Sequence, residues 1–286
     1  MQKIKKNKLG FYFIHPKPDK KKLEKYYKNK YFKNTSSYKY KFTNEEEYYH
    51  KNLSLVKIFM LKKIIKNLDK KNLLDLGAGQ GTFLKNINNY FKNCLGVDFS
   101  EKNLIKKNKS NFKFASMNPE NFIKKNLKKY DVITLNNILE HVIDPVIFMK
   151  KLKKNISKNT LIILTIPNDF SDLQKKTNTK VKKKNYWVCP PEHLNYFNRK
   201  SFLNFAKILG LKIIDAFADF PIELFLLKKE FDYTKNPKLG KKIHLLRCEI
   251  VNYLGDNVSI KDLYDFLKII YKFNIGRDNT YLLKKV

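Results

Sequence analysis

Short apolar runs alternate with stretches of helical periodicity through the middle of the chain, from residue 73 to residue 166. Each run is too short for a helix, and apolar residues recur at helical spacing in the stretches between the runs. Strict alternation of this kind is typical of a doubly wound parallel sheet with right-handed crossovers. The predicted strands cover residues 73–76, 94–97, 112–115, 131–135 and 161–166.

The flanking regions add two strands and more helix. Residues 211–217 and 279–285 read as further strands, and residues 221–274 between them as a mainly helical insertion. A helix begins after Thr43, because Thr43 and Glu46 have the spacing of a capping box.

Residues 1–43 are basic and aromatic, and we expect a helical lead-in with a turn at Pro16–Pro18. Two interpretations of its aromatic residues stay open, a lid over an acceptor site or a surface helix packed on the core. These residues are Tyr26, Tyr27, Tyr31, Phe32, Tyr38 and Tyr40.

The segment LLDLGAGQGTFL (73–84) carries the strongest chemical signal, an apolar strand followed by a glycine-rich turn and a helix start. Gly77, Gly79 and Gly81 would let the backbone approach a ligand closely at the helix N-terminus. Thr82 stands where a dinucleotide fingerprint would need glycine, which disfavours NAD. Asp75, inside the strand, can bind the cationic amino group of an amino-acid moiety through a charge-assisted hydrogen bond, directly or through water.

A second acid supports a nucleoside ligand. Asp98 ends the second predicted strand, 21 positions after Gly77. In doubly wound folds, this position presents a carboxylate to ribose hydroxyls.

With these residues the chain resembles the class I S-adenosylmethionine-dependent methyltransferases over roughly residues 45–286. NNILEHVIDP (136–145) is similar to the fourth-strand motif of one branch of that family. PPEHLNYFNRKSF (190–202) resembles a segment of methyltransferases in bacterial surface-polysaccharide and lipid-modifying pathways. The resemblance implies a Rossmann-like α/β fold with a seven-stranded sheet, mostly parallel with an antiparallel last strand.

The resemblance also assigns the cofactor S-adenosyl-L-methionine to the first half of the chain. Beside the glycines and the two acids, it implies a contact from Asn136. The loop after the third strand lacks the acid that often meets the adenine amino group. This leaves Ser116, Met117 or Asn118 to approach the adenine, and Phe99 could form the adenine slot together with backbone atoms.

The resemblance divides the chain into four segments. After the lead-in (1–43), we expect a cofactor-binding core over 44–220 and an acceptor cap in the insertion, 221–274. Residues 275–286 would return to the core as its final strand.

Two histidines follow strands whose carboxyl ends should face the donor methyl group, and either could act as the general base for a hydroxyl acceptor. They are His141 and His193, and the alternative for each is a histidine that packs or caps a loop. Tyr196 could position a hydroxylated substrate. Glu140 and His141 could also ligate a metal. Zinc sites in proteins have three or four protein ligands, so two do not indicate a site and we expect no metal.

Composition changes this picture little. The formal charge of +34 suggests nucleic acid, yet 57 of the 60 basic residues are lysine, which favours compositional drift and only unspecific binding of polyanions. Three scattered cysteines fit a reducing cytoplasm. No apolar run reaches the roughly 20 residues of a membrane helix, which leaves room for weak peripheral contact with a membrane.

We therefore expect methyl transfer to a small-molecule, sugar-linked or lipid-linked acceptor, most simply O-methylation in polysaccharide or glycan biosynthesis. The alternative is a tRNA or rRNA methyltransferase that uses the basic surface. A catalytically inactive scaffold is disfavoured, because the whole glycine motif is intact.

Overall fold

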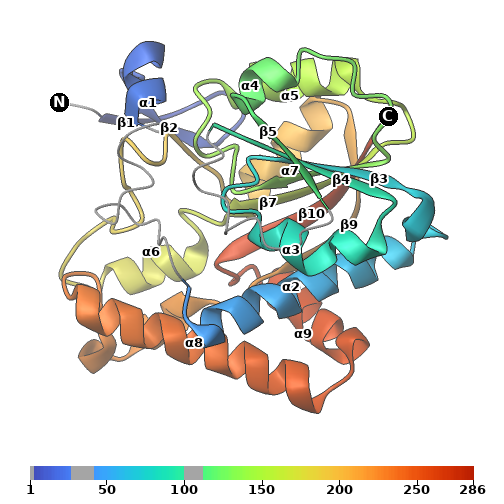
Figure 1. Ribbon diagram of the computed structural model, residues 1–286. Helices are drawn as coiled ribbons and strands as arrows, with labels where there is room; N and C mark the ends of the chain where they lie inside the picture. The colour runs from blue at the N-terminus through green and yellow to red at the C-terminus, as the bar shows by residue number, and fades with distance from the viewer. Residues whose placement is uncertain (1–2, 27–41, 100–111) are drawn as a thin grey trace.

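A seven-stranded sheet runs through the middle of the molecule (Figure 1), in a computed structural model that describes residues 3–26, 42–99 and 112–286. Its strands are β3 (Asn72–Leu76), β4 (Asn93–Asp98), β5 (Lys113–Ser116), β6 (Val132–Asn136), β7 (Leu161–Pro167), β9 (Leu211–Ala218) and β10 (Asp278–Lys285). The spatial order is β5-β4-β3-β6-β7-β10-β9, with β10 antiparallel to both neighbours and the pairs from β5 to β7 parallel. The predicted fold class is confirmed.

Helices cover both faces of this sheet (Figure 1). Successive residues of a strand point to opposite faces, so Leu74 packs in one core and Leu73 in the other. The helices on the Leu74 side are α4 (Pro119–Phe122), α5 (Pro145–Asn155) and α7 (Arg199–Ile208). Those on the Leu73 side are α2 (Asn44–Lys62), α3 (Thr82–Ile87) and α9 (Ile260–Lys272).

The predicted capping box opens α2. The Thr43 hydroxyl accepts from the Glu46 backbone N–H at 3.3 Å, and the Glu46 carboxylate accepts from the Thr43 N–H at 2.9 Å. Two orphan donors are thereby satisfied where the helix starts. The cap fixes the start of the helix that leads into β3.

The start of the chain differs from the expected helical lead-in. Residues 3–15 form a hairpin of β1 (Lys3–Lys6) and β2 (Tyr12–His15), and β2 pairs with β8 (Asn195–Tyr196). The helical expectation is wrong there because alternate residues of β2 face opposite ways. Ile14 is buried against Trp187 and Tyr196, whereas His15 is exposed.

A short helix, α1 (Lys20–Tyr26), follows the two prolines as predicted. Of the aromatic residues proposed as a lid, Tyr26 is described. The others lie outside the described residues: Tyr27, Tyr31, Phe32, Tyr38 and Tyr40.

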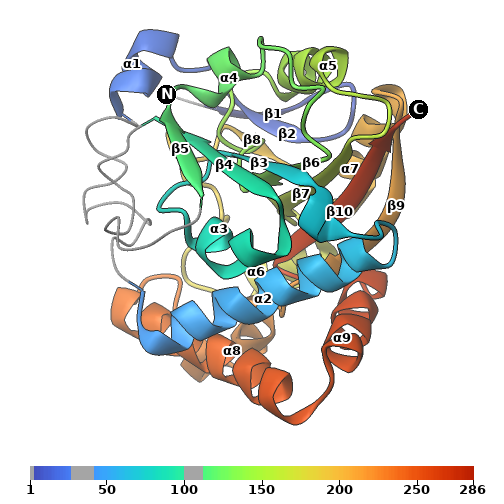
Figure 2. The same ribbon diagram turned by 45° about the vertical axis from the view of Figure 1, so that its right-hand side comes forward.

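The stretch between β9 and β10 is helical, as predicted. Its elements are η5 (Ile222–Leu227), η6 (Lys229–Phe231), α8 (Pro237–Asn257) and α9. Figure 2 shows α8 running beside α2, below the sheet. Three shorter helices complete the described chain: η2 (Leu68–Lys70), η3 (Asn88–Tyr90) and α6 (Asp172–Asn178).

Within the described part of the chain, no helix combines the length and the apolar character needed to cross a membrane.

Candidate functional site

The glycine turn lies at the carboxyl edge of the sheet, directly after β3. Gly77 and Gly79 have φ angles of 75° and 54°, backbone conformations that residues other than glycine rarely adopt. At Gly77 an added Cβ would stand 1.8 Å from Cδ1 of Ile138. Gly81 is the N-cap residue of α3, so the turn directs the N-terminus of that helix toward the same edge.

Asp98, the last residue of β4, is bound to this turn. Its two carboxylate oxygens accept from the backbone N–H groups of Gly79 at 2.8 Å and Phe99 at 2.7 Å. Burial raises the pKa of Asp98, and the two N–H donors oppose that rise. The predicted neighbourhood of Asp98 and the glycine turn is therefore present as a hydrogen-bonded unit.

The residues expected at the adenine converge beside Asp98. The Ser116 hydroxyl donates to the Phe99 carbonyl at 3.2 Å, and the Met117 N–H donates to the Asp98 carbonyl at 2.7 Å. Ser116 ends β5, and its side chain is exposed. These hydrogen bonds bring the ends of β4 and β5 together at the open edge of the sheet.

A buried polar network lies on the other side of the glycine turn. The Asp75 carboxylate is 1% exposed and accepts from the Thr134 hydroxyl at 2.5 Å and the Asn136 amide at 3.3 Å. The Asn136 oxygen in turn accepts from Nζ of Lys57 at 2.6 Å. Burial raises the pKa of Asp75 to about 7 and lowers the pKa of Lys57 to about 8.

Sequence reasoning missed Lys57. Its one available signal is a lysine among the apolar positions of α2, between Val56 and Met60, where a solvated charge is out of place. Its ammonium group also lies 5.3 Å from the ring centroid of Phe83.

A cavity of about 280 Å³ opens over these groups, and we call it the glycine-turn cavity. Lys57, Asp75, Gly77, Gly79 and Asn136 are among the residues that line it.

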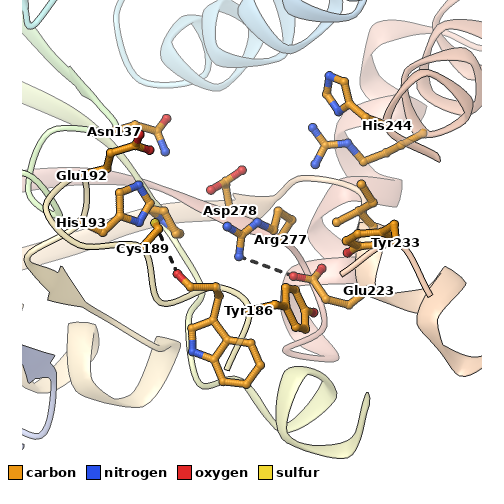
Figure 3. Close-up of a pocket in the computed structure, with 14 residues that line it drawn as sticks. Asn137, Tyr186, Cys189, Glu192, His193, Glu223, Tyr233, His244, Arg277 and Asp278 are labelled. Atoms are coloured by element: carbon orange, nitrogen blue, oxygen red, sulfur yellow. Dashed lines mark hydrogen bonds and ion pairs between the residues drawn. The ribbon is translucent and has the colours of Figure 1, made fainter. Parts of the chain in front are cut away.

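A second cavity, of about 500 Å³, lies next to it and is called here the histidine cavity (Figure 3). His193 lines this cavity, whereas His141 and Tyr196 are not among its lining residues. Asn137, Arg247 and Asp278 line both cavities. The two cavities therefore meet at these three residues.

The two candidate bases lie side by side, with ring centroids 4.9 Å apart. Nδ1 of His141 is 2.6 Å from the backbone oxygen of Glu192. Burial lowers the pKa of His141 to about 4 and that of His193 well below its ordinary value, so both rings are neutral near pH 7. Tyr196 is fully buried, and its hydroxyl donates to the His193 carbonyl at 2.8 Å, which supports the loop.

Glu140 joins the two histidines. One ligand atom from each of Glu140, His141 and His193 lies within 4.8 Å of the others, a grouping found within the described residues. Neutral imidazoles and a carboxylate are suitable ligands for a divalent metal, so this cluster could hold one. The sequence alone indicated only Glu140 and His141 as possible metal ligands, because His193 comes from a loop 52 positions after His141.

Two arginines form ion pairs in the wall of the histidine cavity. Arg277 lies 3.1 Å from the Asp169 carboxylate and 3.4 Å from that of Glu223, and Arg247 lies 3.6 Å from Asp219. The chain has three arginines, so two of them stand here. The net charge gave no sign of these two arginines, because nearly all of the basic residues are lysine.

Fold and site together define the class of S-adenosylmethionine-dependent methyltransferases, with an acid-bearing strand, a glycine turn and a second strand ending in an acid. Residues 46–216, more than half of the chain, match the family model described as a methyltransferase domain. The chain therefore belongs to this methyltransferase family.

A curated relative from Pelagibacter ubique (strain HTCC1062), a ubiquinone biosynthesis O-methyltransferase, is 31% identical over 121 residues. That match covers 40% of this chain and about half, 50%, of the relative.

A solved structure at low sequence identity shows the same fold. A plantazolicin methyltransferase, crystallised with a monoazolic desmethylPZN analog and SAH, aligns over 94% of this chain and 91% of its own, with a TM-score of 0.50 and 16% identity. A SAM-dependent methyltransferase from Archaeoglobus fulgidus aligns over 81% of this chain and 93% of its own, with a TM-score of 0.47 and 20% identity.

Proposed function

We propose that this chain transfers the methyl group of S-adenosylmethionine to a hydroxyl group held in the histidine cavity. The observation that carries the proposal is the meeting of the two cavities at Asn137, Arg247 and Asp278. A donor in one cavity and an acceptor in the other would have their reacting atoms at that junction. Such alignment is the main contribution an enzyme makes to this reaction, since the sulfonium methyl is already electrophilic.

The donor is proposed to lie along the carboxyl edge of the sheet. Asp98 would accept from the ribose hydroxyls, and Phe99, Ser116 and Met117 would flank the adenine. At the other end Asp75 would meet the amino group of the methionine moiety, while Lys57 would meet its carboxylate. The charges of Asp75 and Lys57 are opposite to those of the two groups they would bind.

The acceptor is proposed to be a polar molecule with a sugar-linked or lipid-linked hydroxyl. Aromatic rings and charged groups line the histidine cavity together, as Figure 3 shows for Tyr186 and Glu223. Several polar atoms in its wall have no hydrogen-bond partner among the described residues: Trp187 Nε1, His193 Nδ1, Glu223 Oε2 and Arg247 Nε. A buried polar atom left unpaired costs about 1–3 kcal/mol, which favours a ligand rich in donors and acceptors.

His193 is the proposed base. As the carbon–oxygen bond forms, the carbon–sulfur bond breaks and its electron pair stays on the sulfur, which becomes a neutral thioether. The proton of the hydroxyl goes to the neutral imidazole and then to water. His141 would hold the loop in place through the Glu192 carbonyl.

Methyl transfer from labelled S-adenosylmethionine to a panel of acceptors tests the proposed function. The panel contains nucleotide sugars, lipid-linked sugars, polyprenyl phenols and tRNA. Label in one of the hydroxyl acceptors supports the proposal. Label in tRNA at physiological salt would favour the nucleic-acid alternative instead.

We expect donor affinity to be highest between pH 7 and pH 8. Because the pKa of Asp75 is raised to about 7, binding an ammonium group must remove its proton at lower pH. Because the pKa of Lys57 is lowered to about 8, binding a carboxylate must add a proton at higher pH. Donor affinity should fall by up to about tenfold per pH unit below pH 7, the acidic limb of the profile, and above pH 8, the alkaline limb. Titration calorimetry at a series of pH values would measure both.

Two variants test which residue causes each limb of the pH profile. Asp75→Asn should remove the acidic limb and Lys57→Met the part of the alkaline limb that the enzyme causes. The donor's own α-amino group titrates near pH 8, so the alkaline limb of Lys57→Met need not vanish. An unchanged acidic limb in Asp75→Asn would contradict the assignment of Asp75.

Asp98→Ala should weaken donor binding by about 1.5–3 kcal/mol, because a charge-assisted hydrogen bond to the ribose is lost. The variant also removes the acceptor for the Gly79 N–H. Calorimetry with donor and product measures the loss, and Asp69→Ala in the exposed η2 turn is the control. Unchanged affinity in Asp98→Ala would place the ribose elsewhere.

A further inference from the structure

Asp278 is the carboxylate that stands where the two cavities meet. It lines both the glycine-turn cavity and the histidine cavity. In Figure 3 its carboxylate projects into the middle of the pocket, away from the Arg277–Glu223 ion pair. A ligand in either cavity would therefore have this group within its surroundings.

The sheet holds the backbone of Asp278 in place. It is the first residue of β10 and lies opposite Pro167 in the antiparallel pair with β7. Its carbonyl accepts from the Asp219 N–H at 2.9 Å. The carboxylate thus projects from a fixed point at the edge where the parallel strands end.

The neighbouring acids have partners within the protein. Asp219 pairs with Arg247, and both Asp169 and Glu223 pair with Arg277. The Asp278 carboxylate makes no hydrogen bond and no ion pair with any residue in the ranges 3–26, 42–99 and 112–286. Asp278 lies within electrostatic range of Lys57, Arg247 and Arg277. These three cations already face Asp75, Asp219, Asp169 and Glu223, so the acids of the junction outnumber the cations that attract them.

The proposed function supplies a cation for this position, and the inference rests on it. The methyl group has to cross the junction to reach the acceptor, so the sulfonium sulfur, one bond behind it, must lie there too. That sulfur carries a permanent positive charge before transfer and none afterwards.

We infer that the Asp278 carboxylate faces the sulfonium of the bound donor and makes the site hold the charged donor more tightly than its neutral product. A carboxylate attracts a nearby cation strongly in a partly enclosed site, where the effective dielectric constant is well below that of water. The attraction disappears with the charge on sulfur, so the spent cofactor is held less firmly than the fresh one.

Calorimetry with S-adenosylmethionine and S-adenosylhomocysteine tests the inference without an acceptor. We expect Asp278→Asn to lower donor affinity by about tenfold to a hundredfold, the size of a lost charge-assisted contact. Product affinity should stay within about twofold, because the neutral thioether has no charge to lose. The matched control is Asp98→Asn, which should weaken both ligands alike because both carry the ribose.

The outcomes separate the inference from the proposed function. Equal losses for donor and product in Asp278→Asn, with an unchanged melting temperature, would overturn the inference and leave the donor site intact. Unchanged donor affinity in that variant would overturn it as well. Wild-type protein that binds neither ligand, or Asp98→Asn that affects neither, would overturn the proposed donor site and the inference with it.

Discussion

Replacement of His193 by alanine is expected to lower kcat by about 10²–10⁴, the usual contribution of a positioned general base. His193 lines the histidine cavity and burial keeps its ring neutral, so the imidazole can accept a proton. Donor affinity should hardly change, because His193 is not among the residues that line the glycine-turn cavity. Steady-state kinetics and donor calorimetry on the same variant measure both quantities.

The pH profile adds a second readout. Because burial lowers the pKa of His193 well below its ordinary value, the neutral form that acts as base persists into mildly acidic solution. At saturating donor, kcat should therefore fall with decreasing pH only below about 6.5, the ordinary pKa of histidine.

His141→Ala is the comparison variant. Its ring contacts the Glu192 carbonyl and not the cavity, so its loss should affect acceptor KM or stability more than kcat. If both variants keep nearly full turnover, no histidine base is needed and alignment alone carries the reaction. If a chelator abolishes wild-type turnover and a divalent metal restores it, the Glu140–His141–His193 cluster acts as a metal site and not as a base.

Gly79→Val is expected to reduce donor affinity by about 100-fold or more, the largest effect on binding that we predict. Gly79 lines the glycine-turn cavity, so a branched side chain would occupy space that the donor needs. Its φ of 54° also strains any other residue, by about 1–3 kcal/mol. Donor calorimetry and thermal unfolding would separate lost binding from lost stability.

Gly240→Ala provides the control for removal of a glycine as such. Gly240 lies in α8, and an added Cβ there would be 3.8 Å from Cβ of Tyr233, an ordinary contact. We expect donor affinity to be unchanged in that variant. Normal binding by Gly79→Val would contradict the placement of the donor over the turn.

The strands of the sheet could be predicted from the sequence because each is a short apolar run between helical patterns. Predicted and observed bounds differ by one residue at most ends, as for 73–76 and Asn72–Leu76. The hairpin of residues 3–15 could not be predicted in this way. Its partner strand, Asn195–Tyr196, has two residues and lies about 180 positions further along the chain.

In the candidate site, too, some residues could be predicted from the sequence and others could not. The grouping of Asp75, Gly77 and Asp98 follows from topology, because neighbouring parallel strands end at one edge. Lys57 and Asp278 reach that edge from α2 and from the start of an antiparallel strand. Their arrival depends on how the helices and the last strand pack, which no local pattern encodes.

The three-stranded sheet of β1, β2 and β8 has a consequence for how a protein of this kind diversifies. Its strands β1 and β2 lie outside residues 46–216, and β2 pairs with β8, which follows the loop of His193. Arg247 and Arg277 come to the same cavity from beyond that range on the other side. Under the proposed function, mutations in these flanking segments would change which acceptor is recognised and leave the residues proposed to hold the donor unchanged. Acceptor selectivity could then evolve separately from donor binding.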